Sequence, residues 1–134
     1  MLKKKPRKTN SLIPTKKENP LLKYQNDIDL LIQLYEKGNF KEIISSSESL
    51  IKKFPSNPAV YTFIGASFSN VQNYEKAIEF YKNAILLDPQ NYDAFNNIGV
   101  AYEKARKYDL AIQNIEKAIE FRNFFPEAYN NLAT

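Results

Sequence analysis

Hydrophobic and small residues recur along this chain at helical spacing, and the whole pattern repeats after 34 residues. Within residues 58–91 such residues first fall at positions i, i+3, i+4 and i+7, which lie on one face of an α-helix. A second helical face follows after a short polar break. The positions that recur are Tyr61, Ile64, Gly65, Phe68, Tyr74, Ala77 and Ala84, which return as Phe95, Ile98, Gly99, Tyr102, Tyr108, Ala111 and Ala118. Each repeat therefore predicts a pair of amphipathic helices, and a fixed period of this length predicts a stacked array.

Turn and cap residues mark where these helices begin and end. Asn57-Pro58 suits a helix start, because Asn is a good N-cap and Pro is tolerated at the first helical position. Asp88-Pro89 ends a helix, since proline cannot continue one, and Gly38-Asn39 predicts a turn. We expect helices at about 24–37, 40–53, 59–71, 74–87, 92–105 and 108–121.

The repeats divide most of the chain into equal units. They fall at residues 24–57, 58–91 and 92–125, with a partial repeat at 126–134, in an array that spans 23–134. The first unit is degenerate, as expected for a terminal repeat. Pro126, Tyr129 and Leu132 match Pro58, Phe95 and Ile98, and so predict the first helix of a fourth unit. Half a unit is a poor end for a stacked array, so we expect the sequence to be a piece of a longer repeat protein.

Small residues lie where the two helices of a repeat should cross. Gly65 and Ala77 would let two backbones approach closely, and Gly99 holds the same position in the next repeat. We expect Gly99→Leu to overpack this contact and Gly99→Ala to be tolerated.

Positive charge is concentrated in the N-terminal tail. Residues 1–20 carry seven Lys or Arg and one Glu, a net charge of +6, whereas the rest of the chain carries twelve against fourteen, a net charge of −2. Prolines at 6, 14 and 20 interrupt any helix, so residues 1–22 are predicted to be a disordered basic tail. The tail serves either solubility or contact with nucleic acid or an anionic surface. We do not expect nucleic acid as a partner of the rest of the chain.

The residue types present exclude several classes of site. The chain has no Cys and no His, which excludes disulfides, Cys/His zinc centres, Cys nucleophiles and Ser-His-Asp triads. Its three glycines are too far apart for a phosphate-binding loop or a dinucleotide fingerprint. The Ser45-Ser46-Ser47 run has no base to activate it and is interpreted as a weak stretch of helix. No apolar run is long enough to span a membrane. We therefore expect a cytoplasmic, non-catalytic chain with no cofactor and no metal.

These residues resemble the tetratricopeptide repeat (TPR) family, whose 34-residue pattern is Trp-x₂-Leu-Gly-x₂-Tyr, then Ala-x₃-Phe and Pro. The corresponding residues are Tyr61-x₂-Ile64-Gly65-x₂-Phe68, Ala77-x₃-Tyr81 and Pro89, then Phe95-x₂-Ile98-Gly99-x₂-Tyr102 and Ala111-x₃-Ile115. The resemblance covers residues 24–134. It implies an all-α fold, a right-handed α-solenoid of antiparallel helix pairs with three units and the first helix of a fourth. It also implies a scaffold that binds a protein or peptide on its concave surface.

In this family the first helix of each repeat lines the concave surface, and two features there are candidate binding sites. Asn96-Asn97 and Asn130-Asn131 recur in register. An amide both donates and accepts, so it can hold the backbone of an extended peptide. The row resembles the asparagine ladder of O-linked N-acetylglucosamine transferases. The alternative is that Asn is simply common here, with fifteen in the chain.

The second feature is apolar. Ile28, Ile32 and Phe63 lie toward one end of the same surface, which also carries Val100. They suit an anchor for an apolar side chain of a partner, or they pack against neighbouring helices. The only basic residue on this surface is Lys104, among several carboxylates, so we do not expect a clamp for the carboxylate termini of chaperones.

The leading hypothesis is a non-catalytic module that binds an extended peptide or a partner domain. The alternative is the N-terminal, substrate-recruiting repeat region of a larger glycosyltransferase or sulfotransferase, whose catalytic domain would follow residue 134.

Overall fold

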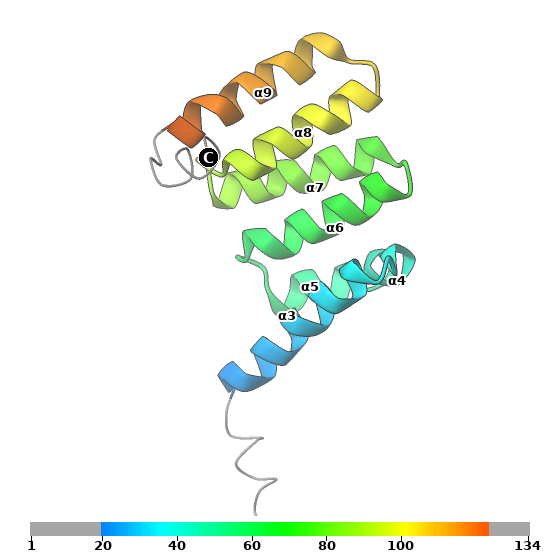
Figure 1. Cartoon of the computed structure of the whole chain (residues 1–134). Coiled ribbons are helices and arrows are strands. Elements are labelled where there is room, and N and C mark those ends of the chain that lie inside the picture. Colours follow the sequence, from blue (N-terminus) through cyan, green and yellow to red (C-terminus); the bar gives the residue numbers. More distant parts are fainter. Residues whose placement is uncertain (1–19, 124–134) are drawn as a thin grey trace, which may run out of the picture.

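The computed structural model of this chain describes residues 20–123, with side chains from residue 26 onward. Throughout that part the regular structure is α-helical (Figure 1). The helices are α3 (Pro20–Glu36), α4 (Phe40–Ser45), α5 (Ser47–Lys53), α6 (Pro58–Asn70), α7 (Tyr74–Leu87), α8 (Tyr92–Lys104) and α9 (Tyr108–Asn123). Helices α6 to α9 stack side by side in chain order, each packed against the next (Figure 1). The expected all-α solenoid of helix pairs is confirmed.

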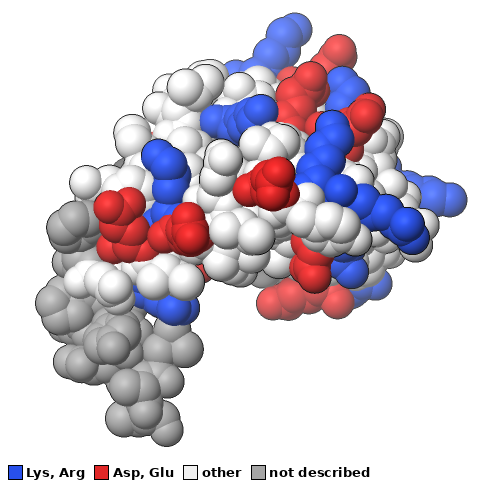
Figure 2. All heavy atoms as spheres, turned by 90° about the horizontal axis from the view of Figure 1, so that it is seen from above, with Lys and Arg blue, Asp and Glu red and all other residues white. Residues whose placement is uncertain are grey.

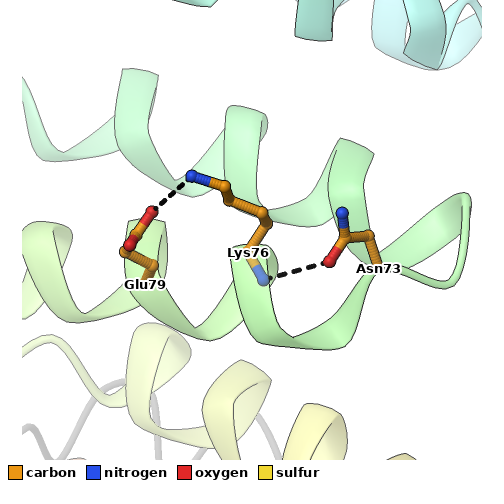
Figure 3. Close-up of polar contacts among 3 residues, drawn as sticks. All are labelled: Asn73, Lys76 and Glu79. Carbon is orange, nitrogen blue, oxygen red and sulfur yellow. Dashed lines mark hydrogen bonds and ion pairs between the residues drawn. The ribbon is translucent and has the colours of Figure 1, made fainter.

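Asparagine caps begin three of these helices. Each side-chain oxygen accepts a hydrogen bond from a backbone N–H of the first turn, where the helix itself offers no partner. Figure 3 shows the cap of α7, where Lys76 also reaches Glu79 through its ammonium group at 3.2 Å. The backbone N–H of Ala59 donates to Asn57 (3.0 Å), that of Lys76 to Asn73 (3.2 Å) and that of Ala94 to Asn91 (3.0 Å).

The turn inside each repeat has the same backbone conformation. Gly38, Gln72 and Arg106 lie 34 residues apart and have positive φ angles of 78°, 67° and 65°. After each of them a backbone N–H donates back into the preceding helix, as in a Schellman motif. These bonds are Asn39 to Leu34 (2.9 Å), Asn73 to Phe68 (2.9 Å) and Lys107 to Tyr102 (2.8 Å). The 34-residue period therefore governs the turns as well as the apolar faces.

Two buried clusters form a core that runs through the stack. The first joins Leu31 and Ile43 to Val60 and Ile64. The second joins α7, α8 and α9 and consists of Ala77, Ile78, Tyr81, Ile98, Ala101, Tyr102 and Ala111. Phe68 packs against both clusters, so the core is continuous from the first repeat to the third.

The glycines at the helix crossings lie in closer contact than expected. A Cβ atom added to Gly65 would lie 2.8 Å from Tyr81 Cδ1 and 3.1 Å from the Ala77 carbonyl oxygen. At Gly99 it would lie 2.5 Å from Ile115 Cγ1 and 3.2 Å from the Ala111 carbonyl oxygen. The expectation that Gly99→Ala is tolerated is therefore wrong, because even one methyl group has no room there.

The first helix begins earlier than the apolar pattern predicts. Helix α3 starts at Pro20, so residues 20–22 are helical rather than part of the disordered tail. The reason is that proline disrupts a helix interior but fits its first turn, where its missing N–H would have no partner. The tail predicted at 1–22 otherwise falls outside the described residues, as does the partial repeat at 126–134.

The second helix of the first repeat is broken, although one helix is expected at 40–53. Helix α4 ends at Ser45 and α5 begins at Ser47. The Ser45 hydroxyl donates to the Glu42 carbonyl at 3.0 Å, a local bond that competes with regular helix geometry. The serine run is thus a weak stretch of helix, as expected, and it divides the second helix of the first repeat into α4 and α5.

The remaining helices agree with the expected ranges to within about two residues, the usual uncertainty of helix ends. No helix within residues 20–123 is long and apolar enough to cross a membrane.

Candidate functional site

A pocket of about 290 Å³ opens on the surface formed by α3, α6 and α8, here called the first-helix surface. Its lining comes from the first helix of three successive repeats, together with one residue of α7. The lining residues are Tyr35, Thr62, Phe63, Ala66, Ser69, Asn70, Tyr81, Asn97 and Val100. None of them is Lys, Arg, Asp or Glu, so the pocket presents apolar and neutral polar groups.

Aromatic rings form one wall of the pocket. Tyr35 meets Phe63 edge to face with ring centroids 5.4 Å apart, and it meets Phe40 in the same way at 5.3 Å. Such pairs stabilise one another beyond simple burial. The wall is therefore an aromatic surface shared by the first two repeats.

The polar groups of the pocket differ in how far they are already satisfied. The Asn70 amide donates to the Ala66 carbonyl at 2.8 Å and to the Tyr35 hydroxyl at 3.4 Å. The Thr62 hydroxyl donates to the Pro58 carbonyl at 3.0 Å. By contrast, no described residue hydrogen-bonds to the side chain of half-buried Asn97. Its donors and acceptor are available to a ligand.

Tyr81 enters the pocket from α7. Its side chain is 3% exposed. Burial raises the pKa of the Tyr81 phenol well above its usual range; the nearby Tyr35 adds to the rise, and a hydrogen bond with Ser69 opposes it. The phenol is thus neutral at physiological pH and serves as a hydrogen-bonding group rather than as a base.

The pocket brings together three of the residues singled out from the sequence. Phe63, Asn97 and Val100 all line it. Asn96 is exposed and lies outside it. Ile28 packs against the first buried cluster, and Ile32 is half-buried but does not line the pocket. Asn130 and Asn131 lie outside the described residues.

Five further lining residues occupy first-helix positions that the repeat register assigns to the concave surface, although they were not singled out as binding residues: Tyr35, Thr62, Ala66, Ser69 and Asn70. The sixth, Tyr81, was missed. Tyr81 belongs to the second helix of its repeat. Its ring reaches the pocket beside Gly65, a contact that only the packed structure shows.

No charged side chain lines the pocket. The described ion pairs are Lys53 with Asp27 at 3.3 Å and Lys76 with Glu79 at 3.2 Å. Within residues 20–123, no three His, Cys, Asp or Glu side chains gather where they could hold a metal ion. The chemistry that the pocket can perform is therefore recognition through shape, apolar contact and neutral hydrogen bonds.

Comparison with known families identifies the same kind of repeat in this chain. Residues 72–105 match a family described as TPR repeat, and residues 92–123 match one described as tetratricopeptide repeat. Together with the stacked helix pairs, these matches show that residues 72–123 consist of tetratricopeptide repeats. No curated protein matches the sequence.

Several solved structures share the fold. One titled "MamA MSR-1 C2" has a TM-score of 0.68 and 20% identity, over 72% of this chain and 55% of that one. The second TPR of Spaghetti (RPAP3), bound to the HSP90 peptide SRMEEVD, has a TM-score of 0.65 and 24% identity, over 69% and 86% of the two chains. The Sgt2 TPR domain from Aspergillus fumigatus has a TM-score of 0.66 and 23% identity, over 71% and 63%. The chain thus spans about half the length of the MamA structure.

Proposed function

We propose that this chain is a non-catalytic interaction module whose first-helix surface binds an extended, uncharged segment of a partner protein. The observation that carries the proposal is the pocket, which three successive repeats build from apolar and neutral polar side chains. Concave sites of this kind, with a few placed polar groups, are the usual form of binding sites.

The pocket offers two complementary contacts to such a segment. The ring pair of Tyr35 and Phe63 suits an apolar side chain as an anchor, because aromatic surfaces bury much area with little loss of side-chain freedom. The Asn97 amide suits the peptide backbone, since it can donate to a carbonyl and accept from an N–H. Recognition of the backbone does not depend on the peptide sequence, whereas the anchor selects an apolar residue.

The solved complex of the Spaghetti TPR with SRMEEVD supports a peptide as the ligand class. That peptide carries two Glu and an Asp, which need cationic partners. Because no Lys or Arg lines the pocket of this chain, we expect it to prefer neutral, apolar peptides over SRMEEVD.

The test is a selection of random peptides on phage against the full chain, followed by calorimetric titration of the selected peptides and of SRMEEVD. We expect the selected peptides to be apolar and neutral, and SRMEEVD to bind more weakly than they do. Phe63→Ala and Asn97→Ala should each weaken the selected peptides, Phe63→Ala by about tenfold or more.

Asn96→Ala is the matched control, because Asn96 is the adjacent residue and lies outside the pocket. It should leave the affinity unchanged. If neither Phe63→Ala nor the double variant Asn97→Ala/Asn131→Ala altered the affinity of any selected peptide, the proposed site would be wrong. No observation on the described residues favours the transferase-linked alternative.

We also infer a cytoplasmic location from the composition of the chain.

A further inference from the structure

The side chains of the pocket on the first-helix surface narrow the kind of segment that it can bind. Six of the nine lining residues carry a hydroxyl or an amide, and none carries a charge. By contrast, charged side chains of both signs are scattered over the face of the molecule that Figure 2 shows from above. The pocket must therefore recognise its ligand through ring contacts and neutral hydrogen bonds.

Two common ways of binding a peptide need charge or a chain terminus, and neither fits this pocket. Capture of an acidic or phosphorylated motif needs a cluster of arginines, and no Lys or Arg lines the pocket. Capture of a charged chain terminus needs a nest of free backbone groups, whereas every lining residue lies within a helix.

Two further ways depend on regular structure that the pocket does not offer or cannot hold. Addition of a β-strand needs an exposed sheet edge, whereas the regular structure throughout residues 20–123 is α-helical. An amphipathic helix needs a long apolar groove for anchors spread over two turns. This pocket holds only about 290 Å³, and most of its lining residues are polar. The mode that remains is an extended polyproline II segment, which docks on aromatic side chains.

The aromatic wall of the pocket suits the ring of a proline. Tyr35 and Phe63 meet edge to face at an interplanar angle of 66°, so the two rings form a corner. Ala66 and Val100 add apolar surface to the lining. Proline has a fixed φ angle, so a proline-rich segment is already close to an extended bound conformation and loses little entropy when it docks.

Two hydrogen-bond donors of the pocket are uncommitted. The Tyr35 oxygen accepts from the Asn70 amide at 3.4 Å, but the Tyr35 hydroxyl donates to no described residue, and the Asn97 side chain bonds to none either. A polyproline II segment has no internal hydrogen bonds, so its carbonyls are free to accept. Proline has no backbone N–H that would need an acceptor. The free donors therefore match the groups that a proline-rich backbone offers.

The spacing of the helices suits the same conformation. Helix α6 contacts both α3 and α8, and packed helices lie about 8–10 Å apart. A polyproline II helix rises about 9 Å per turn of three residues, so it would bring the same edge to each helix in turn. On the basis of the proposed function, we propose that the pocket binds a proline-rich segment of a partner protein in the polyproline II conformation. A proline ring packs in the corner of Tyr35 and Phe63, and backbone carbonyls accept from the Tyr35 hydroxyl and the Asn97 amide.

Calorimetric titration of the full chain with two blocked, uncharged peptides tests this proposal. One peptide consists of Pro-Pro-Leu triplets, and in the other serine replaces each proline, which restores the backbone N–H groups and removes the fixed φ angles. We expect the proline peptide to bind at least about tenfold more tightly. Tyr35→Phe should weaken its binding about fivefold, because the change removes the hydroxyl and keeps the ring. Tyr61→Phe is the matched control and should leave the affinity unchanged, since the Tyr61 hydroxyl donates to the Pro55 carbonyl at 3.0 Å and lies outside the pocket.

The results separate this proposal from the proposed function. Equal affinities of the two peptides, or no binding of the proline peptide, would overturn the ligand class. A proline peptide whose affinity Phe63→Ala does not change would overturn it as well. The proposed function would survive these results if peptides selected on phage still bound in a manner that depends on Phe63. Both would fail together if Phe63→Ala weakened no peptide at all.

Discussion

At the scale of single residues, Gly99 shows how closely the two helices of a repeat approach. A Cβ atom at this position would lie 2.5 Å from Ile115 Cγ1, which is bonded directly to Cβ and moves away only if the whole side chain adopts another rotamer. We therefore expect Gly99→Ala to reduce the free energy of unfolding by about 1–3 kcal/mol and Gly99→Leu to reduce it further. Urea denaturation followed by circular dichroism measures both.

The matched control for this prediction removes the neighbouring side chain. If steric overlap with Ile115 is the cause, Ile115→Ala should restore part of the stability that Gly99→Ala loses, so the two changes should couple. A Gly99→Ala protein as stable as the wild type would show that the helices lie farther apart than described.

Tyr81 makes the stability of the fold depend on pH in the alkaline range. Its pKa in the folded chain is raised by burial, whereas in the unfolded chain it should ionise near the ordinary value of about 10. Above that pH the unfolded chain has lost a proton that the folded chain retains, so stability falls as pH rises. The expected loss is about 1.4 kcal/mol at about pH 11.

The measurement compares wild type with Tyr81→Phe, which cannot ionise. The free energy of unfolding of the wild type, relative to that of the variant, should decrease between about pH 8 and about pH 11 by the amount given above. Deprotonation of lysines affects both proteins alike and cancels in the comparison. A difference that stays constant over this range would mean that Tyr81 ionises as easily in the folded chain as in the unfolded one.

At the scale of the helices, the cap of α7 can be tested against a cap that lacks its side-chain bond. Asn73 accepts from the Lys76 N–H (Figure 3). By contrast, Asn39, at the start of α4, makes no side-chain cap bond. Asn73→Ala should therefore destabilise the chain by about 1 kcal/mol, and Asn39→Ala by clearly less. Equal losses of unfolding free energy in chemical denaturation would mean that the hydrogen bond from the Lys76 N–H to Asn73 adds no stability beyond that of an asparagine at the cap position without such a bond.

Helix ends were predictable where proline and asparagine mark them and where the apolar period is strict. This holds for α6 to α8, whose starts follow Asn57, Asn73 and Asn91. The start of α3 was not predictable from the same rules, because a proline that ends one helix can begin another. The break at Ser46 had a weak signal in the serine run, but helix propensity alone does not decide whether a helix bends or stops.

At the scale of the whole molecule, the pocket was only partly predictable. Phe63, Asn97 and Val100 lie on the surface that the repeat register assigns to them, because a helical period determines which residues share a face. The register does not determine which of these residues share one cavity. The composition of the cavity depends on how closely the helices pack. Tyr81, for example, packs beside Gly65 and so reaches the first-helix surface.

The three repeats should also differ in local stability. In a stacked array each unit is stabilised by its own packing and by its neighbours. The first repeat has Leu31 where the second has Gly65, its second helix is broken at Ser46, and α3 contacts α4 far less extensively than α6 contacts α7. We therefore expect backbone amides of α3 to α5 to exchange with deuterium at least about tenfold faster than those of α6 to α8. Hydrogen exchange followed by mass spectrometry resolves these segments. Equal protection would mean that the described part of the chain unfolds as one cooperative unit, in which the broken helix costs the first repeat no local stability.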